Sequence, residues 1–184
     1  MELKEALDKR HCIRKFKLKS CNAQDIVTIM DSALKAPCAG GLFSVRMILV
    51  EDKETKAKLS EAALDQDFIA KVSHVVVVCS DGKQTRKMYG KYSDAYLRQQ
   101  AGAAIENMLL TATDLGISSC WVGAFDENAV KRVLQIPDDV SVEAILPFGY
   151  ADGKSRTKNK PDLKAVVRME NYAQKPARGK RIES

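Results

Sequence analysis

The strongest pattern of apolar positions lies between Leu97 and Ala124. Apolar residues recur there at helical spacing and also fill the remaining sides, which predicts a helix that is buried almost all the way round. Gly116 follows the last periodic residue and predicts a left-handed helix end. Residues 117–121 then indicate a short buried strand. The apolar helix positions are Leu97, Ala101, Ala103, Ala104, Ile105, Met108, Leu109, Leu110, Ala112 and Leu115.

Shorter patterns on both sides of this stretch predict further helices and strands. Residues 72–80 are β-branched and apolar on both faces, which is typical of a central strand covered on both sides. Asn22 and Asp25 form a capping pair that opens a helix ending before Pro37, and Asp126 caps a helix that reaches Leu134. The other predicted strands are 46–51, 142–148 and an edge strand at 165–168, and the other predicted helices are 3–9, 53–64 and 84–95.

No internal repeat and no long linker divides these elements, so the sequence predicts one domain over residues 1–184, with a basic tail from about residue 172. Helices and strands alternate without a strict order. We therefore expect an α+β sandwich, in which a sheet is flanked by helices.

The composition narrows the setting in which the protein works. No window of about 18 consecutive apolar residues is present, and the N-terminus reads as a charged helix start and not as a signal peptide. The five cysteines, at positions 12, 21, 38, 79 and 120, form no CxxC pair. An odd, scattered set of cysteines favours reduced thiols, and we expect a cytoplasmic protein.

The net charge of +6 is unevenly distributed. Residues 1–20 hold seven Lys/Arg and three Asp/Glu (+4), residues 21–150 hold thirteen and seventeen (−4), and residues 151–184 hold ten and four (+6). The basic ends fit a solubilising tail, a nucleic-acid-binding surface, or two segments that meet on one small anion. Few aromatic residues and no recognition motif are present, which argues against nucleic acid.

Most catalytic signatures are missing, including those of metal sites and phosphate loops. His74 starts a buried strand, where a structural role is expected. His11 lies beside Cys12, which raises the possibility of a thiol nucleophile, but neighbours on an extended segment point to opposite faces. Arg10 and Arg14 fit an anion site better because guanidinium groups bind pairs of oxygen atoms; a basic helix end is the alternative.

Several short motifs, in a constant order, resemble the FMN-dependent nitroreductase family. Residues 10–16 (RHCIRKF) are similar to its RxSxRxF motif and residues 36–41 to its APSAGN loop. Five later segments resemble the family in the same order. The strand that follows is matched by residues 46–50 and the central helix by residues 107–110. The GSCW-hydrophobic-GA segment is matched by residues 120–126, the IP pair by residues 136–137 and the LPxGYP strand end by residues 146–150. The resemblance covers about residues 5–165. It implies a mixed, mainly antiparallel sheet and an intertwined homodimer.

The resemblance also implies a phosphate site at the two basic ends. Arg10, Cys12 and Arg14 would hold the FMN phosphate and ribityl chain, with contacts from His11. One basic residue after Gly149 would close on the phosphate, which agrees with the separate charge count. The candidates for that residue are Arg156, Lys158 and Lys160.

The flavin ring would be held by other segments. The backbone of Gly123 and Ala124 would donate to flavin N5, and Asp65 and Gln66 would face the pyrimidine edge. Three residues of the 36–41 loop would reach the flavin that is bound mainly by the other subunit. These residues are Pro37, Cys38 and Ala39.

The activity implied is oxidation of NADH or NADPH through FMN by a ping-pong mechanism, with a quinone or nitroaromatic as oxidant and no catalytic side chain or metal.

The sequence departs from the family at Cys12 and Cys38, which replace Ser, at Asp65, which replaces Asn, and at residues 41–45. The altered loop bears on substrate range, and it leaves open a flavin-binding or flavin-storage protein with little turnover.

Overall fold

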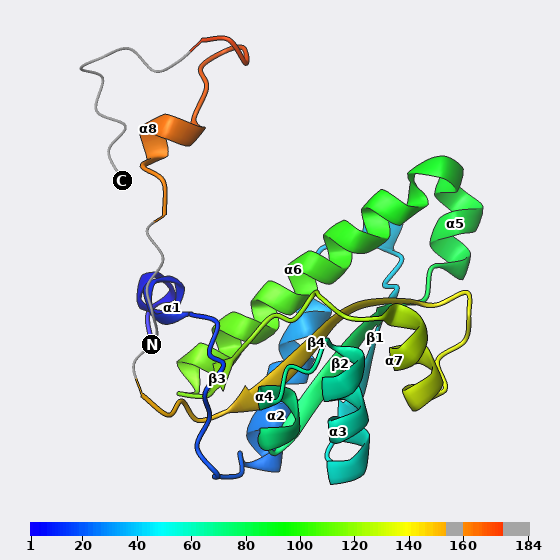
Figure 1. The fold of residues 1–184 in the computed structure, drawn as a ribbon. Helices are drawn as coiled ribbons and strands as arrows, with labels where there is room; N and C mark the ends of the chain where they lie inside the picture. Colours follow the sequence, from blue (N-terminus) through cyan, green and yellow to red (C-terminus); the bar gives the residue numbers. More distant parts are fainter. Residues whose placement is uncertain (154–159, 175–184) are drawn as a thin grey trace.

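A four-stranded antiparallel sheet with the strand order β1-β2-β4-β3 forms the centre of the protein in a computed structural model that describes residues 1–153 and 160–174 (Figure 1). The strands are β1 (Val45–Val50), β2 (His74–Ser80), β3 (Ser118–Ser119) and β4 (Ser141–Gly149). Every residue of β2 is buried, as the β-branched run predicts. Cys12 adds a parallel bridge to Ser119, so the sheet is mixed and mainly antiparallel, as expected.

The long helix α6 (Ser93–Asp114) crosses one face of the sheet beside α2 (Ala23–Ser32) (Figure 1). Ala104, Ile105 and Met108 pack in one cluster with apolar side chains of β2 and β4. The prediction of burial all the way round is too strong for a single chain. Ala103 and Leu110 are only half-buried, because the short helix α1 (Leu3–Lys9) covers only part of the remaining surface.

Helices α3 (Lys53–Ala62), α4 (Phe68–Lys71) and α7 (Glu127–Leu134) cover the opposite face (Figure 1). Asp126 caps α7 by accepting from the Ala129 N–H at 3.0 Å, as predicted. Asn22 likewise caps α2 by accepting from the Gln24 N–H at 2.8 Å. These local signals therefore set where the helices begin.

Two predicted elements are shorter than expected. The helix predicted over residues 84–95 ends as α5 (Lys83–Tyr89), because Gly90 takes a φ of +50° and a 3₁₀ turn (Gly90–Tyr92) follows before α6 begins. The strand predicted over residues 117–121 reduces to β3, followed by an isolated bridge from Val122 to Ile145. Gly116 does take the predicted left-handed conformation, with a φ of +71°. Two further 3₁₀ turns are Ala33–Lys35 and Ala39–Gly41.

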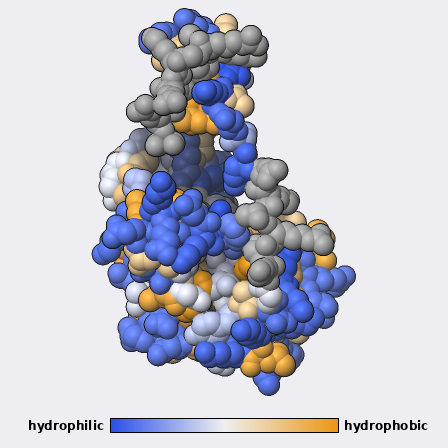
Figure 2. All heavy atoms as spheres, turned by 90° about the vertical axis from the view of Figure 1, so that its left-hand side faces the viewer, coloured by the Kyte–Doolittle hydropathy of each residue, from blue (hydrophilic) through white to orange (hydrophobic). Residues whose placement is uncertain are grey.

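The edge strand predicted over residues 165–168 is wrong. Residues Leu163–Val166 form helix α8, because Asp162 caps it by accepting from the Lys164 N–H at 2.8 Å. This segment lies away from the sheet and its helices, above a largely hydrophilic face of the body (Figures 1 and 2). Among the described residues, no helix combines the length and the apolar character needed to cross a lipid bilayer.

Candidate functional site

The basic N-terminal segment lies in the sheet between β3 and the residues that follow β4. The N–H of Ile13 donates to Ser119 O at 2.8 Å on one side. On the other side, Lys17 N–H donates to Tyr150 O at 2.8 Å and Asp152 N–H donates to Lys15 O at 2.9 Å. The segment that follows Tyr150 therefore starts directly beside the N-terminal segment, as only one of the three interpretations of the charge distribution predicts.

Alternate residues of this segment face different surroundings. His11 and Ile13 line a cavity of about 250 Å³ beside the end of α6, and His11 Nδ1 donates to Arg10 O at 2.6 Å. Cys12 instead faces the Cys120 thiol and the Trp121 N–H. A His11–Cys12 nucleophile pair is therefore ruled out, because the two side chains diverge.

The pKa of Cys12 indicates that the surface around this side chain is electrostatically positive. A hydrogen bond from the Cys120 thiol, then one from the Trp121 N–H, and the positive charges of Arg10 and Arg14 hold the pKa of Cys12 well below its ordinary value, against the opposing effect of burial. Groups that stabilise a thiolate also stabilise other anions. Arg10, Cys12 and Arg14 thus share a positive face suited to a phosphate.

Arg10 and Arg14 have different partners on this face. Arg10 Nε lies 3.1 Å from Glu106 Oε1 on α6 and is largely buried. Arg14 is exposed, and it forms no ion pair within the part of the chain that the structure describes. Arg14 is therefore the guanidinium available to a new anion, while Glu106 fixes the position of Arg10. The sequence pattern gave no signal for Glu106.

The backbone after β3 presents free donors next to this face. Val122 is fixed by hydrogen bonds in both directions with Ile145, at 3.1 and 3.0 Å. Gly123 and Ala124 are exposed, and within residues 1–153 and 160–174 no acceptor takes their N–H groups. A Cβ at Gly123 would have no atom within 4 Å, so the space beside it is open.

The turn that carries Asp65 and Gln66 packs against this backbone. Gln66 Nε2 donates to Ala124 O at 3.2 Å and to Ala63 O at 2.8 Å. Leu64 and Asp65 both take positive φ values, of 60° and 58°, which makes the turn tight enough to bring Gln66 back toward α3. The structure therefore brings the two predicted ring-binding segments together.

The remaining predicted residues are not brought to this place within one chain. The loop with Pro37, Cys38 and Ala39 lies against α5, where a Cβ on Gly40 would clash with the Tyr89 hydroxyl. Lys160 is exposed and has no hydrogen bond or ion pair in the described part of the chain. Arg156 and Lys158 lie outside the described residues.

His74 has the structural role that its place in the sequence indicates. It is 5% exposed, with Ser73 Oγ 2.8 Å from its Nδ1 and Glu51 Oε1 2.9 Å from its Nε2. Both ring nitrogens therefore have partners far from Cys12. This arrangement leaves His74 no free nitrogen for catalysis.

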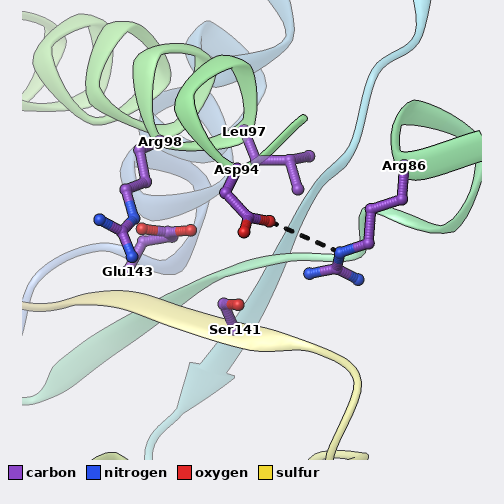
Figure 3. Close-up of a pocket in the computed structure, with 6 residues that line it drawn as sticks. All are labelled: Arg86, Asp94, Leu97, Arg98, Ser141 and Glu143. Atoms are coloured by element: carbon purple, nitrogen blue, oxygen red, sulfur yellow. Dashed lines mark ion pairs between the residues drawn. The ribbon is translucent and has the colours of Figure 1, made fainter. Parts of the chain in front are cut away.

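A separate cavity of about 180 Å³ lies at the opposite end of the sheet, between the start of α6 and the start of β4 (Figure 3). Arg86 Nε lies 3.7 Å from Asp94 Oδ1, and Arg98 and Glu143 point toward one another across the opening. The charged groups of this cavity face each other, and none of the predicted site residues lines it.

Comparisons with known proteins find several relatives of this chain. The family model described as "Nitroreductase family" matches residues 7–83 and 63–150. A protein of Archaeoglobus fulgidus, named as a candidate NADH dehydrogenase/NAD(P)H nitroreductase, is 32% identical over 145 residues, which is 77% of this chain and 80% of that protein. The FMN reductase (NADPH) of Bacillus subtilis is 27% identical over 182 residues, covering 91% of this chain and 73% of the relative.

A solved structure gives the same result. The FMN-dependent nitroreductase of Clostridium difficile superposes with a TM-score of 0.78 at 27% identity, covering 91% of this chain and 98% of that one.

Proposed function

The chain belongs to the nitroreductase family, and from this premise we propose that it is an NAD(P)H-dependent flavoprotein oxidoreductase that uses FMN. The names of its relatives support the cofactor and the cosubstrate. The observation that carries the proposal is the pair of N–H groups at Gly123 and Ala124, which have no acceptor among the described residues and follow a positive face formed by Arg10, Cys12 and Arg14. Bound FMN would supply hydride acceptance from NADH or NADPH and electron delivery to a quinone or nitroaromatic.

The residues of this chain would hold the phosphate and ring ends of FMN. Arg14 and the Trp121 N–H would bind phosphate oxygens, and the Arg10–Glu106 pair would keep the Arg10 guanidinium in place. At the ring end, the Gly123 and Ala124 N–H groups would donate to the flavin, and Gln66 would hold Ala124 in position from the pyrimidine side. These fixed donors would stabilise negative charge on the ring without a catalytic side chain.

A second copy would complete the site. Within one chain, the loop that carries Pro37, Cys38 and Ala39 packs against α5 at Gly40, away from the phosphate and ring segments. In the proposed homodimer these three residues would cover the flavin that the partner holds. The reaction would then proceed by a ping-pong mechanism, because the cosubstrate and the oxidant would use the same covered face in turn.

The purified protein provides the test. We expect a yellow preparation with flavin absorption, rapid bleaching by NADH or NADPH without oxygen, and recovery of the colour when menadione is added. Parallel lines in double-reciprocal plots would support the ping-pong mechanism. A protein that binds FMN but bleaches far more slowly than it is reoxidised would instead be a flavin-storage protein. A chain that takes up no FMN would contradict both.

A further inference from the structure

Two cysteines far apart in the sequence meet at the proposed phosphate face. Cys12 pairs through its backbone with Ser119, the residue before Cys120, and the Ile13 N–H donates to Ser119 O at 2.8 Å. The Cys12 and Cys120 thiols are close enough for each to shift the pKa of the other. Cys12 is exposed, whereas Cys120 is fully buried behind it, and both thiols are free.

We propose that Cys12 and Cys120 form a redox pair, in which a hydroperoxide oxidises Cys12 and the resulting disulfide closes the phosphate-binding face. The closing of that face rests on the proposed FMN function, whereas the formation of the disulfide does not. The proposal uses three features of the structure. These are an exposed thiol on a positive face, a second thiol one residue beyond its bridge partner Ser119, and the backbone pairing that holds the two segments together.

The chemistry proceeds in two balanced steps. The Cys12 thiolate attacks one oxygen of the hydroperoxide; an S–O bond forms, the O–O bond breaks, and the leaving alkoxide or hydroxide takes up a proton. Cys12 is then a sulfenic acid. The Cys120 sulfur attacks the Cys12 sulfur; an S–S bond forms, the S–O bond breaks, and the hydroxyl leaves as water with the Cys120 proton. The two thiols lose two electrons in total, and the hydroperoxide gains them.

The surroundings favour Cys12 as the attacking thiol and Cys120 as the resolving one. Arg10, Arg14 and the Trp121 N–H all stabilise negative charge on Cys12, and the Cys120 proton does the same. The neighbouring Cys12 and, after it, burial raise the pKa of Cys120, which keeps it protonated until its partner is oxidised. Because Cys120 has no exposed surface, a hydroperoxide reaches Cys12 first.

The remaining cysteines do not fit this role. Cys21 and Cys79 are buried, and burial raises the pKa of each thiol, to about 12 for Cys79. Cys38 is half-buried in the loop that lies against α5. It provides a matched control, because it is also a cysteine at a position where the resembling family has serine.

The consequence concerns phosphate binding. A disulfide ties Cys12 back toward the buried Cys120. It also fixes the sulfur in front of the Trp121 N–H, which is a donor that the phosphate would use. Loss of one charge-assisted hydrogen bond predicts a fall in FMN affinity of at least about tenfold.

The experiment uses the full chain without flavin, treated with hydrogen peroxide and digested with trypsin under non-reducing conditions. We expect the peptides of residues 11–14 and 99–131 to be joined, with two thiols lost and both recovered by dithiothreitol. Cys12→Ser should abolish the joined peptide, and Cys38→Ser should leave it unchanged. Oxidation of Cys12 to sulfinic acid without a joined peptide would overturn the proposal, as would equal thiol loss in Cys12→Ser.

A second measurement tests the effect on binding. FMN is titrated into the reduced and the peroxide-treated chain by fluorescence quenching, and FMN-loaded protein is treated with peroxide in parallel. We expect weaker FMN binding after oxidation, and protection of Cys12 when FMN is bound. If the reduced and oxidised chains bind FMN with equal affinity, the proposal that the disulfide closes the phosphate-binding face is wrong. If the disulfide forms but neither form binds FMN, the redox pair stands and the proposed function fails.

Discussion

Gln66 donates from Nε2 to the carbonyl oxygen of Ala124 at 3.2 Å, which joins the turn after α3 to the backbone after β3. The same nitrogen also donates to Ala63 O at 2.8 Å, so one side chain holds two segments that converge on the proposed ring site. The two segments come from opposite halves of the chain, and the site therefore depends on tertiary packing more than on any single motif.

Gln66→Glu replaces this donor with an acceptor of nearly the same shape. Two carbonyl oxygens would then face a carboxylate, and we expect a loss of about 1–3 kcal/mol in the free energy of unfolding. Urea denaturation at neutral pH provides the measurement. Gln99→Glu, at an exposed position of α6, introduces the same charge and serves as the control. Equal stability of the two variants would argue against the Gln66–Ala124 contact.

Arg14→Gln should separate phosphate binding from ring binding. Arg14 is exposed and has no ion-pair partner among the described residues, so its removal should leave the fold unchanged. We expect FMN to bind about ten- to a hundredfold more weakly, because a charged hydrogen bond to phosphate is lost. Riboflavin, which has no phosphate, should bind as before. Lys17→Gln is the control for charge, and a parallel loss of riboflavin affinity would contradict the phosphate role.

The pH dependence of Cys12 alkylation tests the positive face. Its hydrogen bond with Cys120, the Trp121 N–H and the two arginines lower the pKa of Cys12 below the ordinary 9.0, so iodoacetamide should react with it at lower pH than with a free thiol. A lowered pKa in the folded chain means that this thiolate adds stability that is complete above 9.0 and is lost as the pH falls through the folded pKa. The free energy of unfolding of the wild type, relative to that of Cys12→Ser, should therefore increase as the pH rises from the folded pKa of Cys12 to 9.0. An ordinary alkylation profile, or labelling of Cys120 first, would contradict this view.

Gly149→Ala should destabilise the packing between the end of β4 and the N-terminal segment, through Phe16. A Cβ at this position would lie 2.9 Å from Phe16 Cδ1 and 3.2 Å from Val72 Cγ1, so the Phe16 ring would have to move. We expect a loss of about 1–3 kcal/mol in the free energy of unfolding. Adding Phe16→Leu should recover part of it, and a double-mutant cycle in urea measures the coupling. If the two substitutions change the free energy of unfolding additively, a clash between a Cβ at position 149 and Phe16 does not explain the loss of stability.

The exposed side chains of α8 predict where a second copy packs. Leu163 and Val166 are 44% and 59% exposed, and the described residues 160–174 form hydrogen bonds only among themselves. Leu163→Asp combined with Val166→Asp should shift the protein toward monomers, because burying two carboxylates in an apolar interface is unfavourable. Sedimentation velocity measures this shift. Lys164→Asp is the matched surface control, and an unchanged dimer in the double variant would exclude α8 from the interface.

Local signals in the sequence predicted most helices and the central strand. Asn22 and Asp126 placed helix starts correctly because a capping side chain acts on its own backbone. β2 was predicted because its run of valines is β-branched and apolar on both faces, and the structure confirms that every residue in it is buried. The helix predicted over residues 84–95 is interrupted after Tyr89, because Gly90 takes a positive φ that the polar pattern on either side conceals. At 165–168, two valines indicated a strand, but the Asp162 cap favours a helix turn.

The site was predicted in part. The alternation of residues 10–14 correctly separated His11 from Cys12, since side chains on an extended segment alternate. The partners of that segment were not predictable from spacing, because Glu106 and Cys120 meet it only through the packing of α6 and β3. The roles of Arg10, Arg14, Gly123 and Ala124 in holding a flavin stay predictions.

The hydrogen bond from the Lys17 N–H to Tyr150 O has a consequence for protein synthesis. The N-terminal segment leaves the ribosome first, but both of its ladder partners, Ser119 and Tyr150, are made much later. A nascent chain that stops short of β4 contains Glu106 and Ser119 but lacks Tyr150, the partner of Lys17. We therefore expect the proposed phosphate face to be complete only after the last strand has been translated.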